Sequence, residues 1–116
     1  MKGRHVLAIL GSPHTNGITG TMLNYAIGEA EKAGYLVTKV NLYEKKISFC
    51  TGCRKCLETG KCVQKDDLED IVALLRKSEI VILAAPVYWA NVPAPVKNLF
   101  DRLLGTAMEE TSTFPK

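Results

Sequence analysis

No part of this sequence is apolar for long enough to cross a membrane. The longest apolar run, IVILAAPVYWA at residues 80–90, falls well short of the roughly 20 residues that a membrane-spanning helix needs. The N-terminal residues MKGRHVLAIL have a basic start and a short apolar run, but GSPH follows directly and leaves no room for a signal-peptide cleavage site. We therefore expect a cytoplasmic protein that does not contact a membrane.

Neither sign of charge is in large excess, and histidine is scarce. The formal net charge is +3 over 116 residues, which is too small to indicate a nucleic-acid partner. The only histidines are His5 and His14, and we assign neither as a general acid or base. Apolar residues make up 47% of the chain, and it has no low-complexity tract, repeat or linker. Residues 1–116 are therefore expected to form a single domain.

Two kinds of apolar pattern alternate along the chain. Apolar or β-rich runs predict strands, and apolar residues at helical spacing predict helices. The strands are expected at residues 4–10, 35–42 and 79–85, and the helices at residues 18–33, 66–78 and 93–104. This βαβαβα order predicts an α/β domain with a doubly wound parallel sheet, helices on both faces and right-handed crossovers. Ligands of such sheets bind beyond the carboxyl ends of the strands.

The segment GSPHTNGIT, residues 11–19, follows the first predicted strand and opens the first predicted helix. Its glycines and its hydroxyl and amide side chains, together with the free N–H groups of a helix start, suit a bound phosphate. Ile18 stands where a Walker loop has lysine, and the pattern G-x-G-x-x-G is absent. We expect a phosphate monoester here; the alternative is a capped turn without a ligand.

The segment APVYWAN, residues 85–91, follows the third predicted strand. Tyr88 and Trp89 could stack on a flat ring, and Asn91 could bind the polar edge of that ring. The alternative is packing of both aromatics against the neighbouring helix. Because a phosphate loop and an aromatic loop at the ends of adjacent strands support each other, the two together predict a flavin mononucleotide, FMN.

Cysteine is absent from the chain except in one loop, expected at residues 47–65. Its four cysteines have the spacing C-x2-C-x2-C-x5-C and are Cys50, Cys53, Cys56 and Cys62. Disulfides are disfavoured in a reducing cytoplasm, and a redox dithiol would use only two of the four. Zinc sites usually pair two C-x2-C units across a longer gap, whereas three thiols at intervals of three favour iron–sulfur ligation. Zinc and free thiols remain alternatives.

Basic residues surround these thiols. Six lysines and arginines lie between residues 45 and 65, against the single acid Glu58; they are Lys45, Lys46, Arg54, Lys55, Lys61 and Lys65. Nearby positive charge lowers the pKa of a cysteine, so these residues could help to hold several thiolates together. A solvated basic loop is the alternative.

Four segments together carry a family resemblance: GSPHTNGIT, CTGCRKCLETGKCVQKDD, APVYW and VKNLFDR, spaced over residues 4–102. With them, the sequence resembles the iron–sulfur flavoprotein branch of the NADPH-dependent FMN reductase family, which has a flavodoxin-like fold. The resemblance implies that a phosphate loop holds the FMN phosphate through Ser12, His14, Asn16, Gly17, Ile18 and Thr19. It implies that the isoalloxazine ring is lined by Pro86, Val87, Tyr88, Trp89 and Asn91, and that the four cysteines bind a [4Fe-4S] cluster.

These assignments predict an FMN-binding oxidoreductase that transfers electrons between FMN and the cluster, with NAD(P)H or a protein such as a ferredoxin as donor. One alternative is a cluster-free NAD(P)H-dependent FMN or quinone reductase. Another is a metal-stabilised binding module or an inactive fragment. Asp101 and Arg102 are expected to form a local structural pair or a subunit contact.

The strand at 79–85 is internal in the flavodoxin order 2-1-3-4-5, which the resemblance implies. Its unbroken apolar character requires neighbours on both edges, because an open edge exposes unpaired backbone groups. Residues 105–116 contain no apolar run for a fourth strand. We therefore expect only the N-terminal βαβαβα portion of that fold, and we expect the chain either to form a homo-oligomer through this edge or to be a fragment of a longer protein.

Overall fold

A computed structural model describes residues 4–103 of the chain. It contains a three-stranded parallel sheet of strands β1 (His5–Leu10), β2 (Leu36–Asn41) and β3 (Ile80–Ala84) in the order β2-β1-β3. This is the first part of the flavodoxin strand order. The predicted α/β class and parallel sheet are confirmed.

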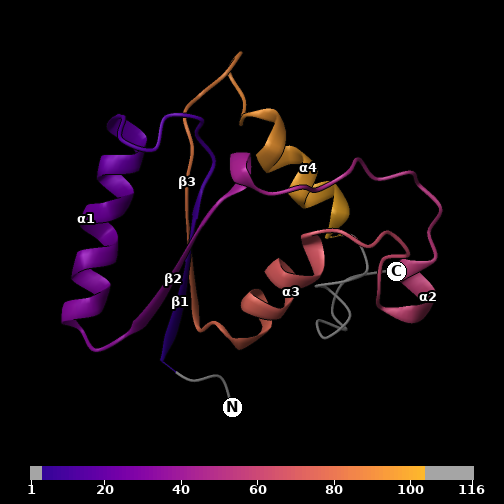
Figure 1. The fold of residues 1–116 in the computed structure, drawn as a ribbon, viewed down its shortest axis with the longest axis horizontal. Helices are drawn as coiled ribbons and strands as arrows, with labels where there is room; N and C mark the ends of the chain where they lie inside the picture. The colour runs from indigo at the N-terminus through magenta and orange to yellow at the C-terminus, as the bar shows by residue number, and fades with distance from the viewer. Residues whose placement is uncertain (1–3, 104–116) are drawn as a thin grey trace.

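Helices cover both faces of the sheet (Figure 1), as predicted. Helix α1 (Ile18–Lys32) lies on one face, and α3 (Leu68–Lys77) and α4 (Ala94–Arg102) lie on the other. Two short elements were not predicted, the 3₁₀ helix η1 (Leu42–Glu44) and the one-turn helix α2 (Cys56–Thr59). The end of the last predicted helix, at residue 104, and the tail at 105–116 lie outside the described residues.

The side chains of β1 alternate between two core layers. Leu7 and Ile9 pack in a cluster with residues of α3 and α4, whereas Ala8 and Leu10 pack with Leu23 of α1. This alternation is a consequence of strand geometry, in which successive side chains point to opposite faces. Strand β1 therefore lies at the centre of the domain and fixes which helices share a layer.

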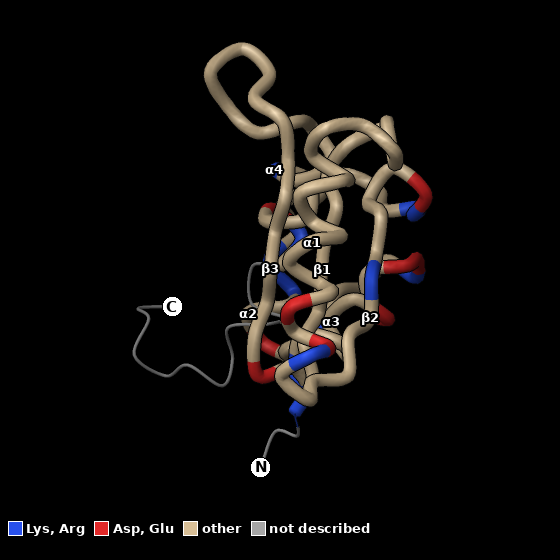
Figure 2. The backbone as a smooth tube through the Cα atoms, turned by 90° about the vertical axis from the view of Figure 1, so that its left-hand side faces the viewer, with Lys and Arg blue, Asp and Glu red and all other residues tan. Residues whose placement is uncertain are grey.

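Strand β3 is an edge of the sheet within the described residues, since β1 is its one partner there. Its side chains Ile80, Val81 and Leu83 are 41%, 45% and 38% exposed. No charged residue interrupts the strand (Figure 2), although charge is a common protection of an open edge. The expectation that a second copy or a further part of the protein covers this edge stays a prediction.

None of the helices in the described part of the chain is both long and apolar enough to span a membrane.

Close packing at Gly20 joins the start of α1 to the loop that precedes it. A Cβ atom at Gly20 would lie 2.1 Å from the Thr15 carbonyl oxygen and 2.9 Å from its carbonyl carbon. These are backbone atoms, so the loop itself would have to move. In contrast, a Cβ atom at Gly28, in the middle of the same helix, would meet nothing within 4 Å.

The two glycines of α1 therefore form a matched pair of variants. We expect Gly20→Ala to lower the free energy of unfolding by about 1–3 kcal/mol, because the new methyl group overlaps the loop backbone. Gly28→Ala should instead raise it by about 0.4–1 kcal/mol through the lower entropy of the unfolded chain. Urea unfolding of both variants measures this, and effects of the same sign would contradict the packing described for Gly20.

Candidate functional site

The loop after β1 and the loop after β3 start side by side at the carboxyl end of the sheet. The N–H group of Gly11 donates to the carbonyl of Ala84 at 2.8 Å, and a Cβ atom at Gly11 would lie 3.3 Å from Cβ of Ala85. Both loops are seen at the top of Figure 1. The structure thus brings together the two segments that the sequence assigns to phosphate and ring binding.

The loop after β1 is held in a tight turn by its own groups. Ser12 is buried, and its hydroxyl oxygen accepts a hydrogen bond from the N–H group of His14 at 3.1 Å. The N–H group of Gly17 donates to the carbonyl of His14, also at 3.1 Å. The side chains of His14, Asn16 and Ile18 are exposed, so Ser12 shapes the turn while its neighbours face the solvent.

Helix α1 begins directly after this turn with an open N-terminus. Its N-cap residue is Gly17, no side chain caps it, and no acidic residue lies in its first turn. The first N–H groups of a helix lack partners within the helix and lie at the positive end of its dipole. The start of α1, which includes Ile18 and Thr19, is therefore suited to an anion.

The aromatic loop forms a two-residue hairpin turn. Tyr88 and Asn91 exchange two backbone hydrogen bonds of 2.8 and 3.0 Å, and the residues between them, Trp89 and Ala90, both have positive φ, at 48° and 59°. This is the pattern of a type I′ turn, which usually contains glycine, asparagine or aspartate. Such backbone strain costs about 1–3 kcal/mol per residue and is concentrated at functional sites.

This turn projects from the end of the sheet beyond β3, as Figure 2 shows. The side chain of Trp89 is fully exposed, and those of Val87 and Tyr88 are 77% and 43% exposed. The alternative in which Trp89 packs against a neighbouring helix is therefore wrong for the described residues. Burial raises the pKa of Tyr43 of η1, and the charge of Tyr88 raises it further.

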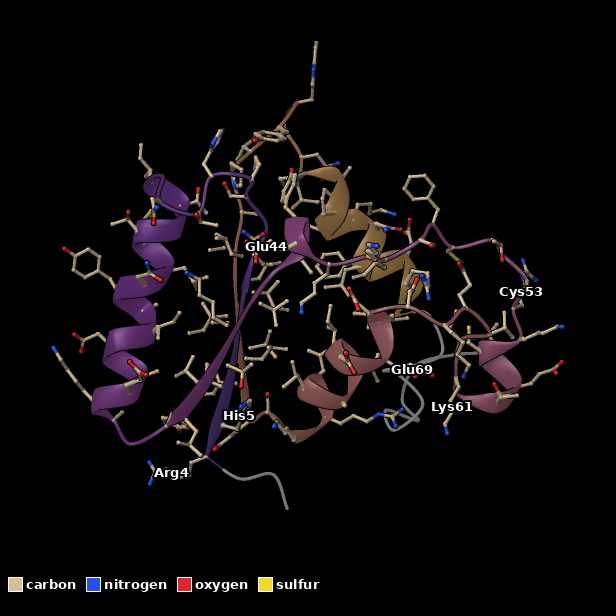
Figure 3. All side chains as sticks on the ribbon, in the orientation of Figure 1. Arg4, His5, Glu44, Cys53, Lys61 and Glu69 are labelled. Carbon is tan, nitrogen blue, oxygen red and sulfur yellow. The ribbon has the colours of Figure 1, made fainter. Side chains whose placement is uncertain are left out.

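The four cysteines all line one cavity of about 300 Å³, together with Gln64 and Arg102. The chain wraps around this cavity through three residues with positive φ, which are Gly52, Arg54 and Gly60. The cavity lies beyond α3 and α4, on the side of the molecule away from α1; Figure 3 shows Cys53 and Lys61 there. No residue of the phosphate loop or of the aromatic turn lines it.

The thiols of this loop influence one another. Burial raises the pKa of Cys56, and the neighbouring charges of Cys62, Cys50 and Cys53 raise it further. The pKa of Cys53 is lowered, mainly by the backbone N–H group of Lys55, with smaller contributions from Thr51 and from the charge of Lys55. The charge of a basic residue thus lowers the pKa at Cys53 only as a minor cause, and it does not prevent the raised pKa of Cys56.

The four thiols that line one cavity are a donor set that can bind metal. Four thiols that repel each other as thiolates would be stabilised by a cationic group between them. Among residues 4–103, no three His, Cys, Asp or Glu side chains converge on a single ion position. A cavity lined by all four sulfur-bearing residues fits a group with several metal atoms.

An ion pair that was not predicted fastens the thiol loop to α4. The guanidinium of Arg102 donates to both carboxylate oxygens of Asp66, at 2.8 and 3.2 Å, and to the carbonyl of Ser48 at 2.8 Å. Its Nη2 also donates to Sγ of Cys62 at 3.4 Å. The expected pairing of Asp101 with Arg102 is not observed, because Asp101 instead pairs with Lys97 on the exposed side of α4.

Asn98 completes this attachment one helical turn earlier. Its side-chain amide donates to the carbonyl of Ile47 at 2.7 Å. Sequence reasoning missed Asn98, Arg102 and Asp66 as a group. The available signal was the segment VKNLFDR, in which Asn98 and Arg102 are four residues apart and therefore share one helix face.

The family model for NADPH-dependent FMN reductase matches residues 4–112. The chain belongs to this family. An iron-sulfur flavoprotein of Archaeoglobus fulgidus is 47% identical over 98 residues, which cover 84% of this chain and 44% of that protein. An iron-sulfur flavoprotein of Methanocaldococcus jannaschii is 34% identical over 97 residues, which cover 84% of this chain and 50% of that protein.

Solved structures of the same fold are more distant in sequence. An NAD(P)H:quinone oxidoreductase from Methanothermobacter marburgensis has a TM-score of 0.71 at 16% identity, covering 89% of this chain and 54% of its own. An azoreductase from Bacillus anthracis has a TM-score of 0.69 at 12% identity, covering 89% of this chain and 55% of its own. The chain thus spans about half the length of the relatives and of the solved structures that it matches.

The Asp66–Arg102 pair makes stability depend on pH. Burial alone would raise the pKa of Asp66, but hydrogen bonds from Arg102 and from the N–H groups of Ser48 and Leu68 lower it below its usual value. A carboxyl group with a lowered pKa in the folded state stabilises the protein above the ordinary value of about 3.9. That contribution is lost as pH falls through the lower pKa of the folded state.

We therefore expect Asp66→Asn to lower the free energy of unfolding by about 3 kcal/mol at pH 7, because it leaves the buried charge of Arg102 without its counter-ion. The difference from wild type should shrink as pH falls through the lowered pKa of Asp66, because Asp66 itself then becomes protonated. Urea unfolding of the metal-free protein at several pH values measures this. A difference that does not change with pH would contradict the ion pair.

Proposed function

We propose that this protein is an FMN-dependent oxidoreductase of the iron–sulfur flavoprotein type, with FMN at the carboxyl end of the sheet and a [4Fe-4S] cluster in the cysteine loop. The observation that carries the proposal is that all four cysteines line one cavity, while the turns after β1 and β3 meet at a separate edge. The match to the FMN reductase family and the names of the relatives support it.

The turn of residues 11–17 and the start of α1 would hold the FMN phosphate. The first N–H groups of α1, at Ile18 and Thr19, supply donors and a positive dipole end. Ser12 would fix the turn through its bond to His14, with Asn16 as an exposed side-chain donor. The close contact of Gly20 with Thr15 would keep the loop pressed against the helix.

The hairpin turn after β3 would supply the surface for the flavin ring. Trp89 and Tyr88 offer exposed aromatic faces, and the strained backbone at Trp89 indicates a position kept for function rather than for packing. Pro86, Val87 and Asn91 belong to the same turn and would complete the lining. When bound, FMN can exchange electrons in pairs or singly, whereas a cluster passes them one at a time.

Absorbance and metal analysis of protein prepared without oxygen test the proposal. We expect flavin bands, a broad shoulder from the cluster, and about four irons per chain, with the iron lost in Cys56→Ala. Flavin without iron would favour the cluster-free NAD(P)H-dependent FMN or quinone reductase, which the fold of the solved structures also accommodates. A colourless protein that cannot be reconstituted with FMN would overturn both functions.

A second prediction concerns the aromatic turn. Trp89→Ala should weaken FMN binding roughly 2- to 10-fold, because it removes one stacking contact. It should leave the unfolding free energy unchanged, because the Trp89 side chain is fully exposed. The matched control is Phe49→Ala, which removes another exposed aromatic, 80% accessible, from the cysteine loop. Fluorescence titration with FMN measures both, and equal affinities for the two variants would contradict the role of Trp89.

The proposed function leaves two kinds of electron donor, NAD(P)H and a small redox protein. NAD(P)H would reach the flavin edge of the sheet, whereas a protein donor such as a ferredoxin would meet the basic residues of the cysteine loop. A protein donor would show a rate that falls steeply with ionic strength, because exposed charges are screened by salt. A salt-independent rate would favour NAD(P)H.

Association into a homo-oligomer through β3 can be checked by sedimentation of the full-length protein, where a monomer would count against it.

A further inference from the structure

Arg102 has surroundings that are unusual for an arginine. It lies in the last turn of α4, and its side chain has no exposed surface. A buried cation is costly unless it is paired and hydrogen-bonded. Four hydrogen bonds from Arg102 go to the loop that carries the cysteines and to Asp66 directly after it.

These contacts reach both ends of that loop. Arg102 binds the carbonyl of Ser48 just before Cys50, and it binds Asp66 and Cys62 at the other end. Asp66 in turn accepts a hydrogen bond from the N–H group of Ser48 at 2.9 Å. The two ends of the loop are therefore tied to each other and to α4 at one point.

The contact with Cys62 differs in kind from the other three. Nη2 of Arg102 lies 3.4 Å from Sγ of Cys62, so a permanent cation donates a hydrogen bond to one of the four sulfur atoms. Hydrogen bonds and charge at ligating sulfurs tune the reduction potential of a cluster. A positive charge at this sulfur stabilises the reduced form, which carries one more electron.

We propose that Arg102 is a positioning residue of the thiol site, which closes the loop through Ser48 and Asp66, orients Cys62, and raises the reduction potential of the metal group held there. The effect of Arg102 on the reduction potential rests on the proposed function, whereas its closure of the loop does not. Lysine cannot replace Arg102 in this role, because one ammonium group cannot donate to Asp66 in a fork and reach Ser48 and Cys62 as well.

Four variants of the full-length protein, prepared without oxygen, separate these effects. Arg102→Leu removes every contact, and Arg102→Lys keeps the charge without the fork. Asp66→Asn weakens the closure but leaves the arginine at Cys62. The matched control is Lys97→Leu, which removes one positive charge from the same helix at an exposed pair. Each variant is measured by amide hydrogen exchange of residues 47–65, by iron per chain, and by a redox titration followed spectroscopically.

We expect exchange in the loop to become on the order of tenfold to a hundredfold faster in Arg102→Leu and less so in Asp66→Asn and Arg102→Lys. The potential should shift to more negative values in Arg102→Leu and should not do so in Asp66→Asn. Lys97→Leu should change neither quantity beyond the small effect of a screened surface charge. If Arg102→Leu is folded but binds no iron, its loss of iron supports the positioning role. The reduction potential is then measured on Arg102→Lys instead.

Two results would overturn the proposal. One is unchanged hydrogen exchange in Arg102→Leu, and the other is a potential shift in Arg102→Leu no larger than that of Lys97→Leu. Failure of the proposed function looks different: wild-type protein would bind no iron, while Arg102→Leu would still loosen the loop. In that case the closure of the loop stands, and the effect on the potential is overturned together with the proposed function.

Discussion

The burial of strand β1 on both faces is the constraint on which the rest of the structure depends. Residues Val6 to Leu10 are at most 3% exposed, and β2 and β3 lie parallel on either side. Parallel pairing sends the chain out of β1 and β3 at the same edge, where the loop of residues 11–17 and the segment that leads to the aromatic turn start side by side. The two core layers then assign α1 to one face and α3 and α4 to the other. The thiol loop precedes α3 in the chain and lies beyond α3 and α4 on their side of the sheet, so the sheet separates it from α1.

The fold was largely predictable because its main elements have clear apolar patterns. Strand β1 and helix α3 carry runs and periodicities that tertiary packing preserves, and their ends lie within two residues of the prediction. Helix α2 and the 3₁₀ helix η1 are too short for a periodicity to be visible. The apolar run of β3 predicted burial on both sides, but its outer edge has no partner among residues 4–103 and its side chains are partly exposed there.

The candidate site was predictable only as far as topology determines it. That the loops after β1 and β3 share an edge follows from parallel pairing, and that four close thiols face one cavity follows from their spacing. The direction of Trp89 does not follow, because it depends on positive φ values that no residue pattern indicated. Neither does the partner of Arg102. Asp101 is its neighbour in the sequence, but successive residues of a helix point in different directions, and the true partner Asp66 lies 36 residues away.

The position of Arg102 along the chain has a consequence for how the protein is made. It follows Cys62 by 40 residues and Ser48 by 54. At about 5–20 residues per second, a ribosome releases the thiols roughly 2–10 seconds before the helix that ties them down. During that interval the four cysteines are exposed on an open segment, where oxygen or a stray metal ion can reach them. The loop that carries the four thiols can therefore be tied down only after α4 has been translated.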